Sequence, residues 1–330
     1  MSESVRAAAE TEQIFQIQKS VESFIKTLGN QTDPATLYDP IRYILHSSGK
    51  RIRPVLTIIS GKMAGGSENQ IMEIAAAIEV FHNFTLVHDD IMDHASERRG
   101  VPTVHVKWDE NVAILSGDMM VGMAYRLIVQ SGSVHLRDIL EIFSDGVDAV
   151  CEGQAFDKEF ETKSDVSIQN YLEMIEKKTG WLIAASLEIG YAAIHGRNET
   201  SSKLKQLGLL LGRGFQLQDD YFDLMGDASF GKKIGGDIVE GKKTYLVLKA
   251  AEMAKEKDLE LVNRIIRHEV SFDEIEMVRS TFKKIGVLDE IEKKISETFQ
   301  QTSDLLNEFS GLPHFPLLKL QIENILNRKF

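Results

Sequence analysis

The sequence predicts an all-helical fold. Apolar residues recur at i, i+3, i+4 and i+7 along almost the whole chain of 330 residues, which is the spacing of one helix face. Only six prolines interrupt this pattern. Segments that alternate between apolar and polar residues, as half-buried strands do, are scarce. The pattern therefore favours a bundle of helices over any architecture built on a sheet.

Three helices are expected before the acidic centre of the chain. The first covers Ala7–Leu28, where the apolar residues form one stripe. Asp39-Pro40 is expected to open the second, because aspartate is a favourable N-cap and proline suits the first helical position. The third helix, Val55–Met63, follows the cationic stretch Gly49–Pro54.

The next helix, expected over Ile71–Asp93, is apolar on two sides and should therefore be buried near the centre of the protein. It carries His82 and His88, which from the pattern alone are most simply hydrogen-bonded core histidines. A polar loop, His94–Thr103, follows. The remaining expected elements are helices over Glu110–Gln130, Val134–Phe160 and Ser167–His195, a helix capped by Thr200, a loop over Gly226–Gly241, and amphipathic helices between Lys243 and Phe330.

The chain shows no internal domain boundary. Its length exceeds that of most single domains, which by itself favours two. However, no linker rich in proline or serine, no block of like charges and no low-complexity segment divides it. We therefore expect one domain over residues 1–330.

The composition indicates an enzyme of a reducing compartment. A formal net charge of -12 argues against nucleic acid as a partner. The single cysteine, Cys151, excludes an intrachain disulfide and is expected on a buried helical face. The N-terminus lacks the regions of a signal peptide, and the longest apolar stretch, Trp181–Ile194, is too short to span a bilayer. We therefore expect a cytoplasmic protein with no membrane span.

Two aspartate clusters with the same pattern form the centre of the candidate site. They lie in Leu86–Asp93 and in Leu217–Asp223. At about 3.6 residues per turn, the first and last aspartates of each cluster lie nearly above one another on a helix, and the middle one flanks them. The six carboxylates are Asp89, Asp90, Asp93, Asp219, Asp220 and Asp223.

Carboxylates packed this closely repel one another, so a bound cation would stabilise each cluster. The first cluster also lies at the C-terminal end of its helix, where the helix dipole disfavours anions. One cluster alone would more simply be a solvated acidic face, but two clusters that each end an apolar run favour metal sites. Oxygen ligands without histidine or cysteine favour Mg²⁺ over zinc.

Cationic residues accompany both clusters, which predicts that phosphate binds together with the metal. Arginine offers a fork of donors to phosphate oxygens, and lysine offers a point charge. Arg51, Lys233 and Lys243 are instead expected to be solvated surface charges. The candidate phosphate-binding residues are Lys50, Arg53, Arg98, Arg99, Lys178, Lys232 and Lys242.

The stretch Gly236–Lys243 nearly matches a P-loop, but it does not predict a nucleotide site. Lys243 replaces the serine or threonine that would bind Mg²⁺, and no strand precedes the loop. Phenylalanines near both clusters could instead line an apolar cavity. A substrate with a diphosphate head and a hydrocarbon tail would fit such a site.

Together these residues resemble the trans-prenyl diphosphate synthases, the polyprenyl synthetase family. The resemblance covers roughly Ile41–Thr244, with Ser48 as a departure where the family usually has glycine. Besides both aspartate clusters, the matching motifs are Gly-Lys-x-x-Arg-Pro at Gly49–Pro54, Arg-Arg-Gly at Arg98–Gly100, Gly-Gln-x-x-Asp at Gly153–Asp157, Lys-Thr at Lys178–Thr179 and Phe-Gln-x-x-Asp-Asp at Phe215–Asp220.

The resemblance implies antiparallel helices around a deep central cavity, a homodimer, and Mg²⁺-dependent head-to-tail condensation of isopentenyl diphosphate with an allylic diphosphate. It implies two or three Mg²⁺ ions per active site. Asp89, Asp93 and Asp219 would be the leading ligands, assisted by Asp90, Asp220 and Asp223. Arg98, Lys178, Lys232 and Lys242 would hold the allylic diphosphate; Lys50, Arg53, His82 and Arg99 would hold isopentenyl diphosphate; Thr179 and Gln216 would stabilise the carbocation.

The resemblance also bears on product length. In the family, the residues four and five positions before the first aspartate form the cavity floor, and here these are Thr85 and Phe84. This pair is similar to the pattern that gives the twenty-carbon geranylgeranyl diphosphate. Phe81, one helical turn deeper, would shorten the cavity, so the fifteen-carbon farnesyl diphosphate stays open as the alternative product.

Two other functions stay open. A terpene cyclase shares the first aspartate motif, but it would lack the isopentenyl site, and Lys50, Arg53 and the complete second cluster argue against it. A non-catalytic partner subunit of a prenyl synthase, or an acidic helical scaffold, would not need both clusters intact. Mg²⁺-dependent binding without turnover would favour this second alternative.

Overall fold

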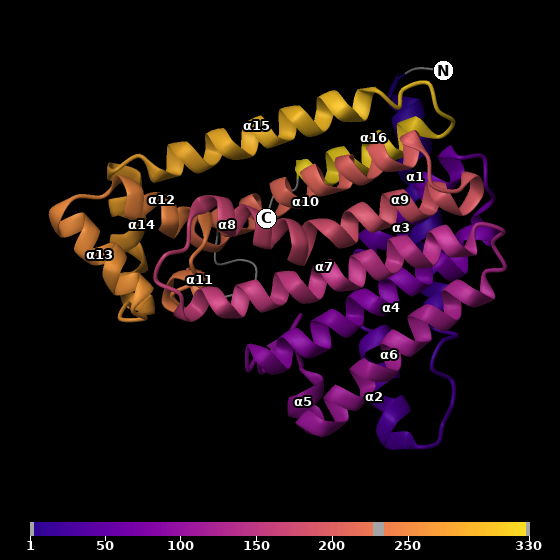
Figure 1. The fold of residues 1–330 in the computed structure, drawn as a ribbon, viewed down its shortest axis with the longest axis horizontal. Coiled ribbons are helices and arrows are strands. Elements are labelled where there is room, and N and C mark those ends of the chain that lie inside the picture. The colour runs from indigo at the N-terminus through magenta and orange to yellow at the C-terminus, as the bar shows by residue number, and fades with distance from the viewer. Residues whose placement is uncertain (1–2, 227–233, 328–330) are drawn as a thin grey trace. The chain divides into compact units, whose positions relative to one another are not determined.

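The computed structural model describes residues 3–226 and 234–327 (Figure 1). Nearly all of the described chain is helical, which confirms the predicted all-α class. Within these ranges the strands are β1 (Glu97–Arg98) and β2 (Val101–Pro102), which pair antiparallel. The helices are α1 (Glu3–Ile25), α2 (Ala35–Leu45), α3 (Ile52–Met63), α4 (Glu68–Met92), α5 (Val104–Lys107), α6 (Glu110–Gln130), α7 (Leu136–Thr162), α8 (Ile168–Ile175), the π-helix η1 (Glu176–Gly180), α9 (Trp181–His195), α10 (Glu199–Met225), α11 (Gly236–Val239), α12 (Tyr245–Met253), α13 (Glu256–Ile266), the 3₁₀-helix η3 (Phe272–Glu274), α14 (Ile275–Lys284), α15 (Val287–Asn307) and α16 (Phe315–Leu326).

The residues group into two compact units. The first unit consists of Met1–Asp145, Ala185–Lys205 and Phe309–Gln321, and it contains the first aspartate cluster. The second unit consists of Gly146–Ala184, Gln206–Glu308 and Ile322–Phe330, and it contains the second cluster. The two aspartate clusters therefore belong to different units.

In the first unit, α4 packs beside α3 and α6 (Figure 1). As expected for a helix that is apolar on several sides, α4 buries Ile74, Ile78 and Phe81 completely. The contact between α3 and α9 is close because Gly190 faces the carbonyl of Thr57, where a side chain would collide. Burial on several sides fixes α4, and with it the position of the first aspartate cluster.

In the second unit, α12 packs against α8, α13 and α15. The core of this unit is apolar, and Val247, Val262 and Phe282 are fully buried in it. Leu217 and Leu224 of α10 join the same core from either side of the second aspartate cluster. The cluster is therefore anchored at both ends by burial of apolar side chains.

Two predicted helix starts are wrong. Helix α2 begins at Ala35 after Pro34, so Pro40 lies inside the helix instead of opening it. Proline at this position removes the hydrogen bond that an amide would donate to the Thr36 carbonyl. Helix α10 is capped by Asn198 rather than Thr200, since the Ser201 amide donates to Asn198 Oδ1 over 3.0 Å. Asparagine is among the strongest N-cap residues, which explains why the helix is capped by Asn198 and not by Thr200.

Some of the other predictions from the sequence are confirmed and others are wrong. The range Glu110–Gln130 is α6 as predicted, whereas Ser167–His195 is divided into α8, η1 and α9. Cys151 was predicted to be buried, but it is exposed, and the buried positions beside it are Ala149 and Val150. By length and composition, α6 is the one helix in the described ranges that could cross a membrane, a test that core helices of soluble proteins also pass.

Candidate functional site

The first aspartate cluster ends α4, and its three carboxylates differ in environment. Asp90 is only 1% exposed; it accepts a hydrogen bond from Nε of Arg98 over 2.8 Å and forms an ion pair with Nη2 of the same residue over 2.8 Å. Burial raises the pKa of Asp90, and the charge and hydrogen bond of Arg98 oppose that rise. Asp89 is partly exposed and Asp93 is exposed. The middle aspartate thus serves an internal contact, and the flanking two are the accessible pair.

A short hairpin delivers the two arginines that follow the cluster. Strands β1 and β2 pair Arg98 with Val101, and the turn between them is Arg99-Gly100 with φ of 55° and 75°. Two positive φ values are typical of a type I′ turn, which glycine favours at its second position. The hairpin positions Arg98 to bond to Asp90. It also positions Arg99, whose Nη1 donates to the carbonyl of Ser48 over 2.6 Å.

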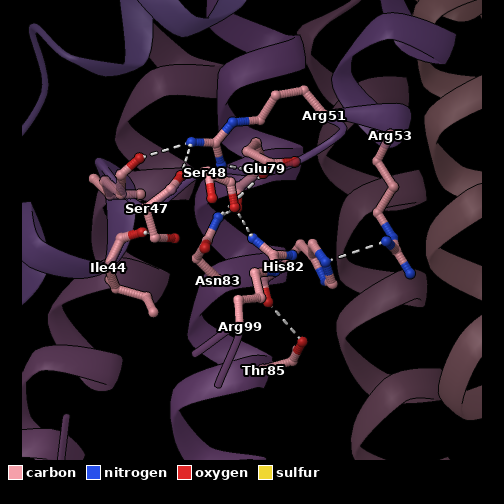
Figure 2. Close-up of polar contacts among 11 residues, drawn as sticks. Ile44, Ser47, Ser48, Arg51, Arg53, Glu79, His82, Asn83, Thr85 and Arg99 are labelled. Atoms are coloured by element: carbon pink, nitrogen blue, oxygen red, sulfur yellow. Dashed lines mark hydrogen bonds and ion pairs between the residues drawn. The ribbon is translucent and has the colours of Figure 1, made fainter. Parts of the chain in front are cut away.

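Arg53 and His82 are in direct contact in the same unit (Figure 2). Arg53 Nη1 lies 3.2 Å from His82 Nε2, and because a guanidinium can only donate, the imidazole accepts. Burial lowers the pKa of Arg53 to about 10. Burial, followed by the charges of Arg53 and Arg99, lowers the pKa of His82 well below its usual value. His82 is therefore neutral among cations and carries its proton on Nδ1.

Arg51 was predicted to be a solvated surface charge, and the structure contradicts this. The residue is 5% exposed, and its Nη1 donates to Oε1 of Glu79 over 2.7 Å. Figure 2 shows the guanidinium turned inward toward α4. Glu79 is itself 4% exposed. Neither residue was selected as functional from the sequence, although a lone glutamate in the apolar run of α4 could have indicated a buried partner.

The second aspartate cluster lies on α10, and again its middle carboxylate is turned inward. Asp220 is 3% exposed and accepts hydrogen bonds from the Tyr171 hydroxyl and from Gln216 Nε2, the latter over 3.1 Å. Burial, and next the charge of Asp237, raise the pKa of Asp220 well above its usual value. Thr179 Oγ1 donates to Gln216 Oε1 over 3.1 Å. Two predicted catalytic residues, Thr179 and Gln216, therefore belong to one hydrogen-bonded chain that ends at Asp220.

Lys178 and Thr179 belong to the π-helix η1 rather than to a regular α-helix. Such π-bulges are rare and often mark functional positions. Lys178 Nζ donates to Asp157 Oδ2 over 2.6 Å. Gly153 of α7 lies against the backbone of Lys178, where an added Cβ would collide with its N and Cα atoms. This close approach positions Lys178 beside Asp157.

The chain after α10 returns to the second cluster. Asp223 Oδ2 accepts from the amide of Asp237 over 3.1 Å, and Lys242 forms ion pairs with Asp237 and Glu240 over 3.2 Å and 2.9 Å. Burial tends to lower the pKa of Lys242, but these two carboxylates outweigh it and raise the pKa. Lys242 is thereby connected to the second cluster through Asp237, whereas Lys232 and Lys233 lie outside the described residues.

Lys243 corrects a second prediction of a surface charge. It is 9% exposed, and its ammonium donates to the backbone carbonyls of Phe160 and Glu161. Burial lowers its pKa. Lys243 therefore joins the start of α12 to the end of α7 within the second unit, and it is a structural cation.

The residues fit a divalent cation, although no group of three or more candidate ligands is already gathered in the part of the chain that the structure describes. The available donors are hard carboxylate oxygens, which suit Mg²⁺. Because Asp90 and Asp220 are buried, the partly or fully exposed aspartates are the better candidates to hold metal. These are Asp89, Asp93, Asp219 and Asp223.

The residues predicted to set product length are Phe81, Phe84 and Thr85 of α4, and the two phenylalanines form an aromatic group. The Phe81 ring centroid lies 5.3 Å from that of Phe84 and 5.3 Å from that of Phe143 on α7. Phe81 is fully buried, whereas Phe84 and Thr85 are partly exposed. Thr85 Oγ1 donates to the carbonyl of His82 over 2.8 Å. Phe84 is thus the accessible member of the aromatic group, and the buried ring of Phe81 packs against it.

The chain is similar to proteins of one family. The profile of the family described as polyprenyl synthetase matches residues 34–285. A short chain isoprenyl diphosphate synthase of Methanothermobacter thermautotrophicus is 42% identical over 235 residues, which are 71% of this chain and 72% of that protein. A geranylgeranyl diphosphate synthase of Sulfolobus acidocaldarius is 37% identical over 322 residues, covering 95% of this chain and 97% of that one.

A solved structure gives the same result for the fold. The crystal structure of geranylgeranyl pyrophosphate synthetase from Pyrococcus horikoshii matches with a TM-score of 0.88 and 34% identity, covering 97% of this chain and 99% of that chain. The family profile includes both aspartate clusters and the residues around His82. The chain therefore belongs to the polyprenyl synthetase family and is a prenyltransferase.

Proposed function

We propose that this protein condenses isopentenyl diphosphate with an allylic diphosphate, head to tail and with Mg²⁺, to give a short-chain all-trans prenyl diphosphate. The observation that carries the proposal is the neutral His82 enclosed by Arg53 and Arg99 next to the first aspartate cluster. This excess of positive charge calls for a multiply charged anion. A terpene cyclase, which ionises one diphosphate only, has no use for a second anion site.

In this proposal, the two sets of cations divide the substrates. Lys50, Arg53, His82 and Arg99 hold the diphosphate of isopentenyl diphosphate. Arg98, Lys178, Lys232 and Lys242 hold the allylic diphosphate, and both aspartate clusters serve the same reaction within one domain over residues 1–330. Bound Mg²⁺, two or three ions per site, would neutralise the charge that develops on the departing diphosphate. The aspartates that hold it are Asp89, Asp93, Asp219 and Asp223, with Asp90 and Asp220 orienting the arrangement.

The chemistry follows from these assignments. The allylic carbon–oxygen bond breaks, and its electron pair leaves with the diphosphate, to which Lys178 and Lys242 donate. The oxygens of Thr179 and Gln216 stabilise the allylic cation. The double bond of isopentenyl diphosphate supplies the electrons of the new carbon–carbon bond, and a proton leaves to the released diphosphate.

We propose geranylgeranyl diphosphate as the main product, because Phe84 is the accessible face of the aromatic group that would stop the growing chain. Farnesyl diphosphate is the alternative, which the support of Phe81 beneath Phe84 would favour. Mass spectrometry of the products formed from isopentenyl and dimethylallyl diphosphates with Mg²⁺ tests both. A single twenty- or fifteen-carbon diphosphate supports the proposal, and no condensation with any allylic primer favours the partner-subunit function.

We also infer a cytoplasmic homodimer. Helix α6 exposes Ile114, Leu115 and Val129, an apolar row that a second copy of the chain would cover. Light scattering in buffer without detergent tests this inference. A monodisperse particle of twice the mass of the chain supports it, and a requirement for detergent favours a membrane-bound α6 instead.

A further inference from the structure

Arg51 forms a turn that connects three elements of the first unit. Its backbone is left-handed, with φ of 48° and ψ of 38°, between the end of α2 and the start of α3. Nη2 donates to the carbonyls of Leu45 and Ser47 over 2.9 Å and 2.7 Å. The carbonyl of Leu45 is one of those that the end of α2 leaves without a helical partner. The guanidinium thereby caps α2 with a positive charge at the end that favours one.

The same guanidinium pairs with Glu79, which a second residue of α4 holds in place. Asn83 Nδ2 donates to the Glu79 carbonyl over 2.8 Å and to Glu79 Oε1 over 3.3 Å. All three side chains are buried. Removing two charges from water costs about as much as the buried pair returns, so net stability alone does not explain such a pair. The buried pair instead holds the side chains of Arg51 and Glu79, and the backbone that Arg51 contacts, in one conformation.

The segment that this pair fixes is residues 47–51, which we call the Lys50 loop. Arg99 holds the loop from its other side, because Nη1 donates to the Ser48 carbonyl. At Gly49, an added Cβ would lie 2.9 Å from Arg99 Nη1, so a larger residue would displace this guanidinium group. The Lys50 loop is thus held between the guanidinium groups of Arg51 and Arg99, which bond to the carbonyls of Ser47 and Ser48 (Figure 2). Lys50 itself is exposed.

Glu79 also acts on the neighbouring cations. Its charge raises the pKa of Arg53 and of Arg99 against the burial that lowers both. The carboxylate therefore offsets part of the repulsion among these arginines in the absence of an anion. It pairs directly with Arg51, so it does not occupy Arg53 or Arg99 by an ion pair.

We propose that Arg51, through its buried pair with Glu79, is a positioning residue that holds the Lys50 loop ready for the diphosphate of isopentenyl diphosphate. The inference rests on the proposed function above. It assigns no contact with substrate to Arg51. Preorganisation of the loop would lower the cost of ordering it when the anion binds.

The test compares Arg51→Lys and Glu79→Gln with the wild-type protein. Lysine keeps the charge but has one nitrogen on a shorter side chain in place of the two guanidinium nitrogens that reach the carboxylate and the carbonyls. Glutamine keeps the shape of Glu79 without its charge. We expect KM for isopentenyl diphosphate to rise at least about tenfold in both variants, as misplacement of a binding group predicts. We expect kcat and KM for the allylic substrate to change less than about threefold. The matched control, Arg137→Lys, alters the exposed pair of Arg137 with Glu141 in the same unit and should change neither constant.

Calorimetric titration with inorganic pyrophosphate separates the possible failures. A wild-type protein that neither condenses the substrates nor binds pyrophosphate contradicts the proposed function itself. An active wild type with folded variants whose KM for isopentenyl diphosphate is unchanged overturns the role of Arg51 alone. If both KM values rise and kcat falls to the same extent, or if neither variant folds, the Arg51–Glu79 pair is a folding element. Either result would also overturn the positioning role of Arg51.

Discussion

The guanidinium of Arg53 donates to Nε2 of His82 across 3.2 Å, and this contact fixes the charge state of the histidine. A protonated imidazole has no lone pair to accept the bond. The contact joins α3 to α4 near the first aspartate cluster, and Arg99 adds further positive charge beside it. A proton added to His82 would therefore raise the repulsion between the imidazole and the guanidinium groups of Arg53 and Arg99.

The stability of the ligand-free protein should depend on His82 in acid. Because its pKa is lowered in the folded state, the unfolded chain takes up a proton as pH falls through about 6.5 while folded His82 does not. The free energy of unfolding should therefore fall below that pH, by at most about 1.4 kcal/mol per pH unit from this residue, and be unaffected by it at higher pH. Urea unfolding of the wild type and His82→Gln between pH 5 and 8 measures the difference. The exposed His46→Gln is the control, and equal slopes for all three proteins would contradict a neutral His82.

Phe84→Ala should lengthen the product. Removing the ring opens space next to Phe81 and lets the chain grow before it meets the aromatic group. The products from isopentenyl and dimethylallyl diphosphates, separated by chain length, provide the measurement. Phe15→Ala, which removes an exposed ring from α1, is the control and should leave the product unchanged. Products of the original length from Phe84→Ala would rule out Phe84 as the floor.

Gly153→Ala should lower both stability and turnover. The added methyl group would collide with the backbone of Lys178 and push η1 away from α7. We expect a loss of about 1–3 kcal/mol, as for overpacking, and a fall in kcat because Lys178 moves. Thermal unfolding and initial rates measure the two effects.

Gly122→Ala is the matched control, since Gly122 also lies within a long helix but an added Cβ there meets no atom within 4 Å. This substitution should be neutral or stabilise the protein by about 0.5–1 kcal/mol, because alanine favours the helix. An equal response of the two glycines would mean that the contact with Lys178 has no special importance.

Removal of divalent cations should abolish condensation and leave the fold intact. In the described ranges no preassembled group of three ligands needs an ion to offset its charge, and the helical cores are apolar. Chelation should therefore leave the far-ultraviolet circular dichroism unchanged and stop product formation, which Mg²⁺ should restore. Loss of helical signal on chelation would show instead that the metal has a structural role.

Asp89→Asn and Asp90→Asn should differ in their effects. Asp90 receives a hydrogen bond and an ion pair from Arg98, so neutralising it should disturb the hairpin and weaken binding of the allylic diphosphate. Asp89→Asn should instead raise the Mg²⁺ concentration needed for half-maximal rate by about tenfold or more, as expected when one hard ligand is lost. The reaction rate of both variants is measured as a function of Mg²⁺ concentration. Identical curves would contradict separate roles for the two carboxylates.

The sequence was sufficient for features that depend on neighbours in the chain. Helical spacing of apolar residues predicted the all-α class and the limits of α6, because that spacing reports one buried face directly. The repeated aspartate pattern likewise identified both acidic helix segments. These conclusions need only the helical repeat and the chemistry of carboxylates.

The sequence could not reveal which polar groups are buried, because burial depends on residues far away in the chain. Arg51 and Lys243 read as surface charges, yet their long side chains reach Glu79 and the carbonyl of Phe160. Cys151 read as buried because its apolar neighbours set the pattern, yet it lies on the exposed side of α7.

The same limit applies within the aspartate clusters, where helical geometry alone treats the three carboxylates as one set. The structure distinguishes the middle residues, since Arg98 holds Asp90 and Tyr171 holds Asp220. The sequence by itself determined which chemistry the chain carries. Tertiary packing decided which of these groups stay accessible, because a charged side chain is buried only where distant donors and acceptors replace its water.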